Sequence, residues 1–186
     1  RRVLFRSELS MTSPAPYSAY FKFNNNHILS SSPERFINIS SEGKINSRPI
    51  KGTLDRNKNK KILQNSSKDK AENLMIVDLM RNDIARSAKV GSVSVDQLFH
   101  IDSFTTLHHM SSSINGTKKP SVSTLQAIKS SFPPGSMTGT PKIAAINALK
   151  KLENYNRNIY SGCLGYFAGD GSCDLSVVIR TIIIQN

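Results

Sequence analysis

The sequence predicts an α+β fold made mostly of antiparallel sheets with flanking helices. Short segments with period-two alternation, separated by turn residues, fill the stretch 17–50 and indicate a meander of strands. Two longer segments, near 67–86 and 143–152, carry apolar residues at the helical spacings of three and four. Hairpins and helices follow one another without the regular strand–helix alternation of parallel α/β folds.

The meander begins with a strand over 17–23, where aromatic and small residues alternate with polar ones. Asn24 to Asn26 supply a turn, because asparagine tolerates the left-handed conformation. A second strand is expected over 27–31 and ends before Pro33. The third and fourth strands are expected over 36–39 and 45–50, joined by a turn at Glu42-Gly43.

The segment 55–68 is polar and rich in Lys and Asn, which predicts an exposed loop. A long helix is expected over 67–86, since no Gly or Pro interrupts its apolar stripe. Ser66 or Ser67 is the candidate cap, with Asp69 favourably placed in the first turn.

The remaining elements are two strands, two helices and a hairpin. Strands are expected over 93–99 and 103–114, and a short helix over 123–131. A loop over 133–140 leads into the next helix, with Thr140 as its cap and Pro141 at its first position. The chain closes with a hairpin whose arms span 164–168 and 175–184. We expect the last arm to be one central strand buried on both faces, and therefore expect the natural protein to continue past Asn186.

Composition limits the class of protein. The chain has 186 residues, 38% of them hydrophobic, and a formal charge of +12, which fits a globular domain. No apolar run approaches the ~20 residues of a membrane helix, and two cysteines are too few for a disulfide framework. Residues 1–7 resemble the conceptual translation of a sequencing-adapter end and are expected to be a non-native tail. Without their three arginines the charge is +9.

Two segments carry candidate chemistry on charged side chains. Lys51 lies between an apolar residue and Gly52, so it either points to solvent or enters a cleft as a nucleophile or base. Asp69 and Glu72, three residues apart on one helix face, are able to hold Mg²⁺ directly or through water. The alternative is a solvated surface with a pair between Lys68 and Glu72.

Two further segments point to an anionic ligand. The loop 135–142 leads into a helix N-terminus, which either binds an anion or merely caps the helix. His108-His109, Tyr160 and Arg180 form the last group. A histidine is commonly a satisfied core residue, whereas Arg180 within an apolar strand needs an anionic partner from the protein or from a ligand carboxylate.

Five motifs in order closely resemble the chorismate-utilising enzymes over 15–184. They are Ser32 to Phe36, Arg48 to Thr53, Ala71 to Asp83, Gly135 to Lys142, and Gly162 to Thr181. The resemblance implies the layered α/β sandwich of that family, truncated at both ends, with 8–186 as a partial catalytic domain. A lysine at the Lys51 position is typical of members that form 4-amino-4-deoxychorismate, whereas anthranilate synthases typically have alanine there.

The resemblance also implies roles for nine residues. Lys51 is the expected nucleophile at C2 of chorismate, Glu34 the general acid or base for departure of the 4-hydroxyl, and ammonia then adds at C4. The other implied roles are His109 near the leaving group, Arg180 on the enolpyruvyl carboxylate, Thr138 and Gly139 lining the pocket, Tyr160 donating to a substrate carboxylate, Glu72 ligating Mg²⁺ and Asp69 holding its water shell.

The implied enzyme is an aminating synthase of the transaminase or lyase type, cytoplasmic and serving 4-aminobenzoate and folate synthesis. Its ammonia is expected from a glutamine amidotransferase subunit or domain. The family usually has Gly at Pro134 and commonly Ala at Thr140. It also has an N-terminal half, a glycine-rich turn and a second acidic metal segment that this chain lacks, so we expect the chain alone to be inactive.

Three alternatives remain. Anthranilate synthase component I is disfavoured by Lys51, and an isochorismate or salicylate synthase resembles the chain less around 49–53. A basic nucleic-acid-binding module calls for aromatic side chains among clustered Lys and Arg. The Lys58, Lys60 and Lys61 cluster lacks them, so neither a nucleic acid nor a membrane is an expected partner.

Overall fold

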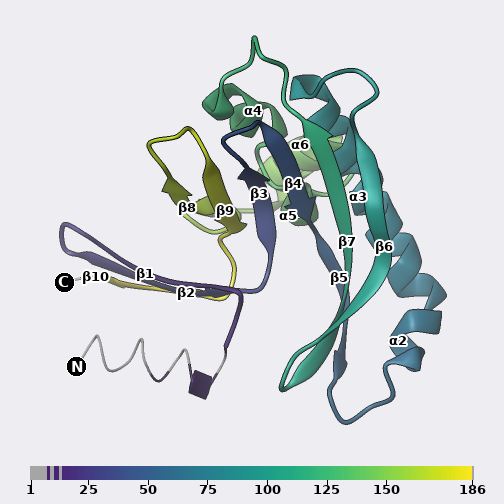
Figure 1. Cartoon of the computed structure of the whole chain (residues 1–186). Coiled ribbons are helices and arrows are strands. Elements are labelled where there is room, and N and C mark those ends of the chain that lie inside the picture. The colour runs from purple at the N-terminus through teal and green to yellow at the C-terminus, as the bar shows by residue number, and fades with distance from the viewer. Residues whose placement is uncertain (1–7, 9–10, 13, 186) are drawn as a thin grey trace.

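The computed structural model describes residues 8, 11–12 and 14–185. The predicted non-native tail, residues 1–7, lies outside this range. The chain forms two antiparallel sheets and a set of helices that lie against one face of the larger sheet (Figure 1). Every strand pairing in the two sheets is antiparallel, which confirms the predicted α+β class.

The smaller sheet has the order β1-β2-β10 and projects to one side of the molecule (Figure 1). Its strands are β1 (Tyr17–Phe23), β2 (Asn26–Ser32) and β10 (Thr181–Gln185). In the larger sheet the strands pair in the order β5-β7-β4-β3-β9-β8. β4 and β5 pair with different parts of β7, and β6 pairs with β7 as well. Its strands are β3 (Arg35–Ile39), β4 (Lys44–Arg48), β5 (Ile50–Asp55), β6 (Ser94–Ser103), β7 (Leu107–Thr117), β8 (Cys163–Phe167) and β9 (Cys173–Val177).

The helices are α2 (Lys61–Asn65), α3 (Ser67–Ser87), α4 (Thr124–Ser131), α5 (Gly135–Thr138) and α6 (Lys142–Leu152). The predicted start of α3 is confirmed, because the Ser66 side chain accepts a hydrogen bond from the Asp69 backbone N–H. The apolar stripe of α3 is buried in the core against the larger sheet. This core includes Phe36, Ile37, Ile45, Ile76, Val77, Met80, Ile84, Ile114 and Leu175.

Several predicted boundaries were wrong, including those of β6 and β7, which were expected over 93–99 and 103–114. The segment 55–68 is not all loop, since it contains the short helix α2. The strand expected over 45–50 is two strands, β4 and β5, which Pro49 separates while both pair with β7. Helix α6 begins at Lys142 with Pro141 in the cap position and no side-chain cap, so Thr140 is not its cap.

The last predicted strand was also wrong. The segment 175–184 leaves the larger sheet after β9 and joins the smaller one as β10. The change of direction occurs at Arg180, whose φ is +48°. Ile182 and Ile183 on β10 are each 41% exposed, so this strand is not buried on both faces.

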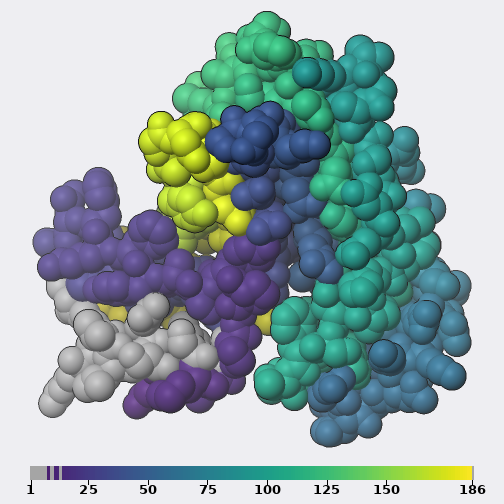
Figure 2. Space-filling model, viewed as in Figure 1, coloured from purple at the N-terminus to yellow at the C-terminus, as the bar shows by residue number. Residues whose placement is uncertain are grey.

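The face of the larger sheet opposite the helices is hollowed beside the smaller sheet. A cavity of about 210 Å³ lies between residues of the β1 end, including Tyr17, and Phe104 at the β6–β7 turn. Figure 2 shows the hollow between the N-terminal strands, in purple, and the β6–β7 hairpin, in teal. Within the described residues, no helix is both long and apolar enough to cross a membrane.

Candidate active site

Lys51 stands on a β-bulge of β5, where this strand pairs with β7 in the larger sheet. Ile50 pairs with Ser111 and Thr53 pairs with His109, so Lys51 and Gly52 together face one residue of β7. The bulge depends on Gly52, whose φ of +88° is costly for any residue with a side chain. Because a bulge redirects side chains, Lys51 leaves the regular alternation of β5. Its Nζ donates to the Ser136 carbonyl oxygen at 3.4 Å.

Glu34 lies in the turn between β2 and β3 and is only 6% exposed. Burial raises the pKa of Glu34 to about 7, while a hydrogen bond from the Ser136 hydroxyl, the charge of Lys51 and the Ile50 backbone offset part of this increase. The carboxyl therefore changes protonation state near neutral pH, which is the property that a general acid or base needs.

His109 on β7 is 2% exposed and lies beside the bulge. Its Nδ1 is 2.9 Å from the Thr53 hydroxyl. Burial, followed by the positive charge of Arg180, lowers the pKa of His109 below its usual value. The lowered pKa favours the neutral imidazole, which is held beside the bulge by Thr53.

Arg180 differs from its predicted setting. It is exposed in the turn before β10 and lines a small cavity of about 50 Å³ with His109, Pro33 and Phe104. None of the ion pairs among the described residues includes it. Its guanidinium thus remains available for a ligand carboxylate next to His109.

Asp69 lies over the bulge, whereas Glu72 lies further along α3. A Cβ atom on Gly52 would come within 3.0 Å of the Asp69 Cβ and Cγ atoms. Glu72 is 46% exposed and its Oε1 is 3.9 Å from the Lys68 Nζ, the pair that the surface alternative predicted. The described residues contain no group of three or more side chains able to hold a metal ion. Two carboxylates still suit Mg²⁺, which commonly takes one or two and fills its other positions with water and substrate.

The segment 133–140 was predicted as a loop, but it contains the short helix α5, which places Ser136 at this site. Gly135 packs so closely on α3 that a Cβ atom there would lie 2.7 Å from the Leu79 Cδ2. Lys142 holds the loop from the other side, donating to the buried carboxylate of Asp83 and to the carbonyl oxygens of Ser131 and Pro133 at 2.9 Å. The backbone around Ser136 is therefore fixed at both ends.

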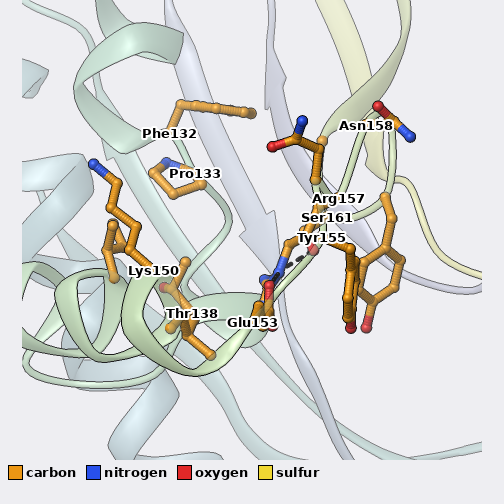
Figure 3. A pocket seen from close by; sticks show the side chains of 14 residues that line it. Phe132, Pro133, Thr138, Lys150, Glu153, Tyr155, Arg157, Asn158 and Ser161 are labelled. Atoms are coloured by element: carbon orange, nitrogen blue, oxygen red, sulfur yellow. Dashed lines mark hydrogen bonds and ion pairs between the residues drawn. The ribbon is translucent and has the colours of Figure 1, made fainter.

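Thr138 and Tyr160 lie in a different cavity, of about 480 Å³, whose lining does not include Lys51, Glu34 or His109. Figure 3 shows Arg157 at its centre, bonded to Glu153 and Ser161. The Arg157 guanidinium also lies over the Tyr160 ring, 5.7 Å from its centroid. Gly139, with a φ of +99°, ends α5 at the edge of this region.

The family model described as chorismate binding enzyme matches residues 4–186. The chain belongs to this family. It is 46% identical over 181 residues to a chloroplastic aminodeoxychorismate synthase of Arabidopsis thaliana, covering 92% of the chain and 20% of that protein. It is 42% identical over 186 residues to aminodeoxychorismate synthase component 1 of Escherichia coli strain K12, covering 96% of the chain and 41% of that protein. The crystal structure of anthranilate synthase component I from Streptococcus pneumoniae TIGR4 covers the whole chain with a TM-score of 0.90 and 31% identity.

This member of the chorismate binding enzymes spans a fifth to two fifths of the length of the relatives just named. The predicted family and its fold are confirmed, whereas the roles assigned to single residues stay predictions. The structure brings Lys51, Glu34, His109 and Asp69 to one bulge of the larger sheet, with Arg180 beside His109. Thr138 and Tyr160 lie in the neighbouring cavity.

Sequence reasoning did not single out Ser136, Arg157 or the Asp83–Lys142 pair. Ser136 and Lys142 fall within the Gly135-to-Lys142 motif, and Asp83 ends the long helix motif. Asp83 and Lys142 carry opposite charges and lie in motifs next to apolar residues. Because buried charges need partners, an ion pair between them could have been predicted. Arg157 had no comparable signal, since it follows Glu153 by four residues and oppositely charged residues at that spacing are common on exposed surfaces.

Proposed function

We propose that the protein containing this chain converts chorismate and ammonia into 4-amino-4-deoxychorismate. The observation that carries this proposal is the placement of Lys51 on a bulge, with its Nζ 3.4 Å from the Ser136 carbonyl oxygen and its charge acting on the buried Glu34 carboxyl. The names of the relatives at 42 to 46% identity support the same activity. The amination itself, the substrate and the partners belong to the complete protein and are proposed for it.

In the proposed reaction, the Lys51 Nζ lone pair forms a bond to C2 of chorismate. Both ring double bonds shift by one position and the C4 hydroxyl leaves as water, taking a proton from Glu34. Ammonia then bonds to C4, both double bonds shift back, and the C2–Nζ bond breaks with its electron pair returning to Lys51. The new ammonium group gives a proton to Glu34, which restores the starting state. A pKa of about 7 leaves Glu34 partly protonated at neutral pH, as the first step requires.

Substrate carboxylates and the metal account for the remaining candidate residues. Arg180 is proposed to pair with the enolpyruvyl carboxylate, while Thr138, Gly139 and Tyr160 line the adjoining part of the substrate pocket. Asp69 and Glu72 would hold Mg²⁺, which when bound neutralises the ring carboxylate. Their fit rests on the position of Asp69 against the bulge and on the carboxylate chemistry of the pair.

We also propose that the ammonia comes from a glutamine amidotransferase subunit or domain, that the protein is cytoplasmic, and that the product serves 4-aminobenzoate and folate synthesis. The relative from E. coli is itself named as a component, which supports a multi-part enzyme. Anthranilate synthase component I is the second candidate, favoured by the TM-score of 0.90 to such an enzyme. Lys51 is the residue that separates the two candidates.

The test is product identity with the complete polypeptide. Incubation with chorismate, Mg²⁺ and ammonium, followed by mass analysis, should yield 4-amino-4-deoxychorismate. Lys51→Ala should lose this product, whereas Lys58→Ala in the exposed loop after β5 should retain it. Anthranilate as the main product of the wild-type protein would contradict the proposal.

A further inference from the structure

The ammonium group of Lys142 ties α3 to the end of α4 and to the loop that follows it. It donates to the Asp83 carboxylate on α3 and to the carbonyl oxygens of Ser131 and Pro133, the last two at 2.9 Å. A lysine ammonium has three N–H donors, so these three acceptors use all of them. The side chains of Lys142 and Asp83 are only 12% and 3% exposed, and hydrogen bonds in such an interior are stronger than in water.

These bonds close the segment 131–142 into a loop with joined ends. Ser131 is the last residue of α4 and Lys142 is the first residue of α6, so a side chain at one end binds the backbone at the other. Compact loops of this kind keep a defined shape, because joining their ends removes conformational freedom. Within the loop, α5 packs against α3 at Gly135, which leaves no room for a side chain beside Leu79.

The loop carries residues to the proposed active site. Ser136 on α5 places its carbonyl oxygen 3.4 Å from the Lys51 Nζ. Thr138 and Gly139, which are proposed to line the substrate pocket, follow it in the same loop. A shift of the loop would change the surroundings of the proposed nucleophile, and a misplacement of about 1 Å can cost on the order of 10²-fold in rate.

We propose that Lys142 is a positioning residue of the chorismate site, which closes the loop 131–142 and so holds Ser136 and Thr138 in place beside Lys51 and the substrate. The inference rests on the proposed function. Lys142 acts through the loop, since its ammonium has no N–H left for a substrate. If the ion pair only stabilised the fold, activity would follow stability whichever partner is changed. A positioning role predicts that activity follows the two carbonyl bonds.

The experiment uses the complete polypeptide as wild type, Lys142→Met and Asp83→Asn. Both variants lose the buried ion pair and should be less stable than wild type. Lys142→Met also loses the bonds to the Ser131 and Pro133 carbonyl oxygens. Asp83→Asn keeps both of these bonds, and its amide oxygen remains an acceptor for the ammonium. The comparison therefore separates the hold on the loop from the stability of the fold.

The first measurement is amide hydrogen exchange without substrate, followed in peptides that cover 132–141. Inside the loop, the Met137 and Gly139 amides donate to the carbonyl oxygens of Pro134 and Gly135, each at 3.1 Å. In Lys142→Met the loop amides should exchange about 10- to 100-fold faster than in wild type, because bonds to a charged donor are lost. In Asp83→Asn the change should stay within about threefold.

The second measurement is steady-state consumption of chorismate, whatever the product. In Lys142→Met the kcat should fall by roughly 10- to 100-fold. KM should change less, because Arg180, the proposed partner of the enolpyruvyl carboxylate, lies outside the loop. Asp83→Asn should retain kcat within about threefold of wild type.

Lys151→Met is the matched control, because Lys151 is exposed in the last turn of α6. It should leave both the exchange and kcat unchanged. The double variant Asp83→Asn/Lys142→Met has no unpaired buried charge and serves if Lys142→Met fails to fold. It should show the same faster exchange and lower kcat as Lys142→Met, since it also lacks the two carbonyl bonds.

Equal losses of kcat in Lys142→Met and Asp83→Asn would overturn the inference, because activity would then follow stability alone. So would unchanged exchange of the loop in a folded Lys142→Met protein. Conversion of chorismate to anthranilate by the wild-type protein would overturn the proposed function, yet the kcat comparison would still decide the role of Lys142. If the wild-type protein consumed no chorismate, the proposed function would fail while the exchange still decided whether Lys142 holds the loop.

Discussion

Replacing Glu34 by glutamine is expected to stabilise the protein at neutral pH while abolishing its activity. The folded protein holds this carboxyl at a pKa of about 7, against an ordinary value of 4.5. Between these two values the folded state binds more protons than the unfolded state, so the free energy of unfolding decreases as pH rises. Above pH 7 the wild-type protein has lost about 3 kcal/mol of its free energy of unfolding through ionisation of Glu34. Glutamine does not ionise, so the variant avoids this loss.

The assay is urea unfolding of the complete polypeptide, wild type and Glu34→Gln, at several pH values from 4 to about 8. Contributions from other parts of the protein cancel in the difference between the two. Glu42→Gln is the control, because Glu42 is exposed and hydrogen bonds from Ser40 and Ser41 lower its pKa. Glu42 therefore stabilises the folded state at higher pH, and this stabilisation is lost as pH falls. The pH dependence of Glu42→Gln should thus be opposite in sign to that of Glu34→Gln.

The expected result is a difference between Glu34→Gln and wild type that grows as pH rises from about 4.5 to 7 and then levels off. Chorismate amination by the variant should fall by about 10²- to 10⁴-fold, the usual contribution of a general acid or base. A difference that does not change with pH would refute the argument from burial. Retained activity would refute the role assigned to Glu34.

Three further predictions concern the bulge, the loop and the metal. Gly52→Ala should lower the free energy of unfolding, measured in urea, by about 2–4 kcal/mol, because alanine there is strained and meets close contacts. Gly91→Ala is the control: Gly91 has a φ of +76° and open space around it, so the loss should be about 1 kcal/mol. Equal losses in the two variants would contradict the close packing at Gly52. Lys142→Met should lower stability by about 3–5 kcal/mol at neutral pH by leaving the Asp83 charge unpaired, and by less at acid pH where Asp83 takes up a proton. A loss independent of pH would contradict that reason. Asp69→Asn should raise the Mg²⁺ concentration for half-maximal activity by roughly 10- to 100-fold, and an unchanged Mg²⁺ requirement would exclude Asp69 from the metal site.

Local patterns were enough to predict most of the elements but not how the sheets divide. Helix α3 was predictable because one of its faces is buried and its cap is a local contact of Ser66. The apolar residues of 177–184 give no indication of which sheet they join. Arg180 takes a positive φ there, and the chain changes sheets at that point. Nothing in a β-branched run predicts such a kink, because it depends on the position of β2.

The site was predictable in its residues more than in its geometry. The motif around Lys51 indicated a functional lysine, but the bulge that redirects it exists only in the register between β5 and β7. Ser136 is a small neutral residue within a motif, so the contact of its carbonyl oxygen with the Lys51 Nζ appears only when β5 and α5 are assembled. Tyr160 was expected with the catalytic group, yet its ring packs on Arg157 in the adjoining cavity.

The most direct test of the account is whether Lys51 becomes covalently attached to the substrate. The complete polypeptide would be incubated with chorismate and Mg²⁺ without ammonia, digested, and its peptides analysed by mass. The account predicts that the peptide containing Lys51 gains the mass of chorismate less one water. Unmodified Lys51 in a protein that aminates chorismate once ammonium is added would contradict it.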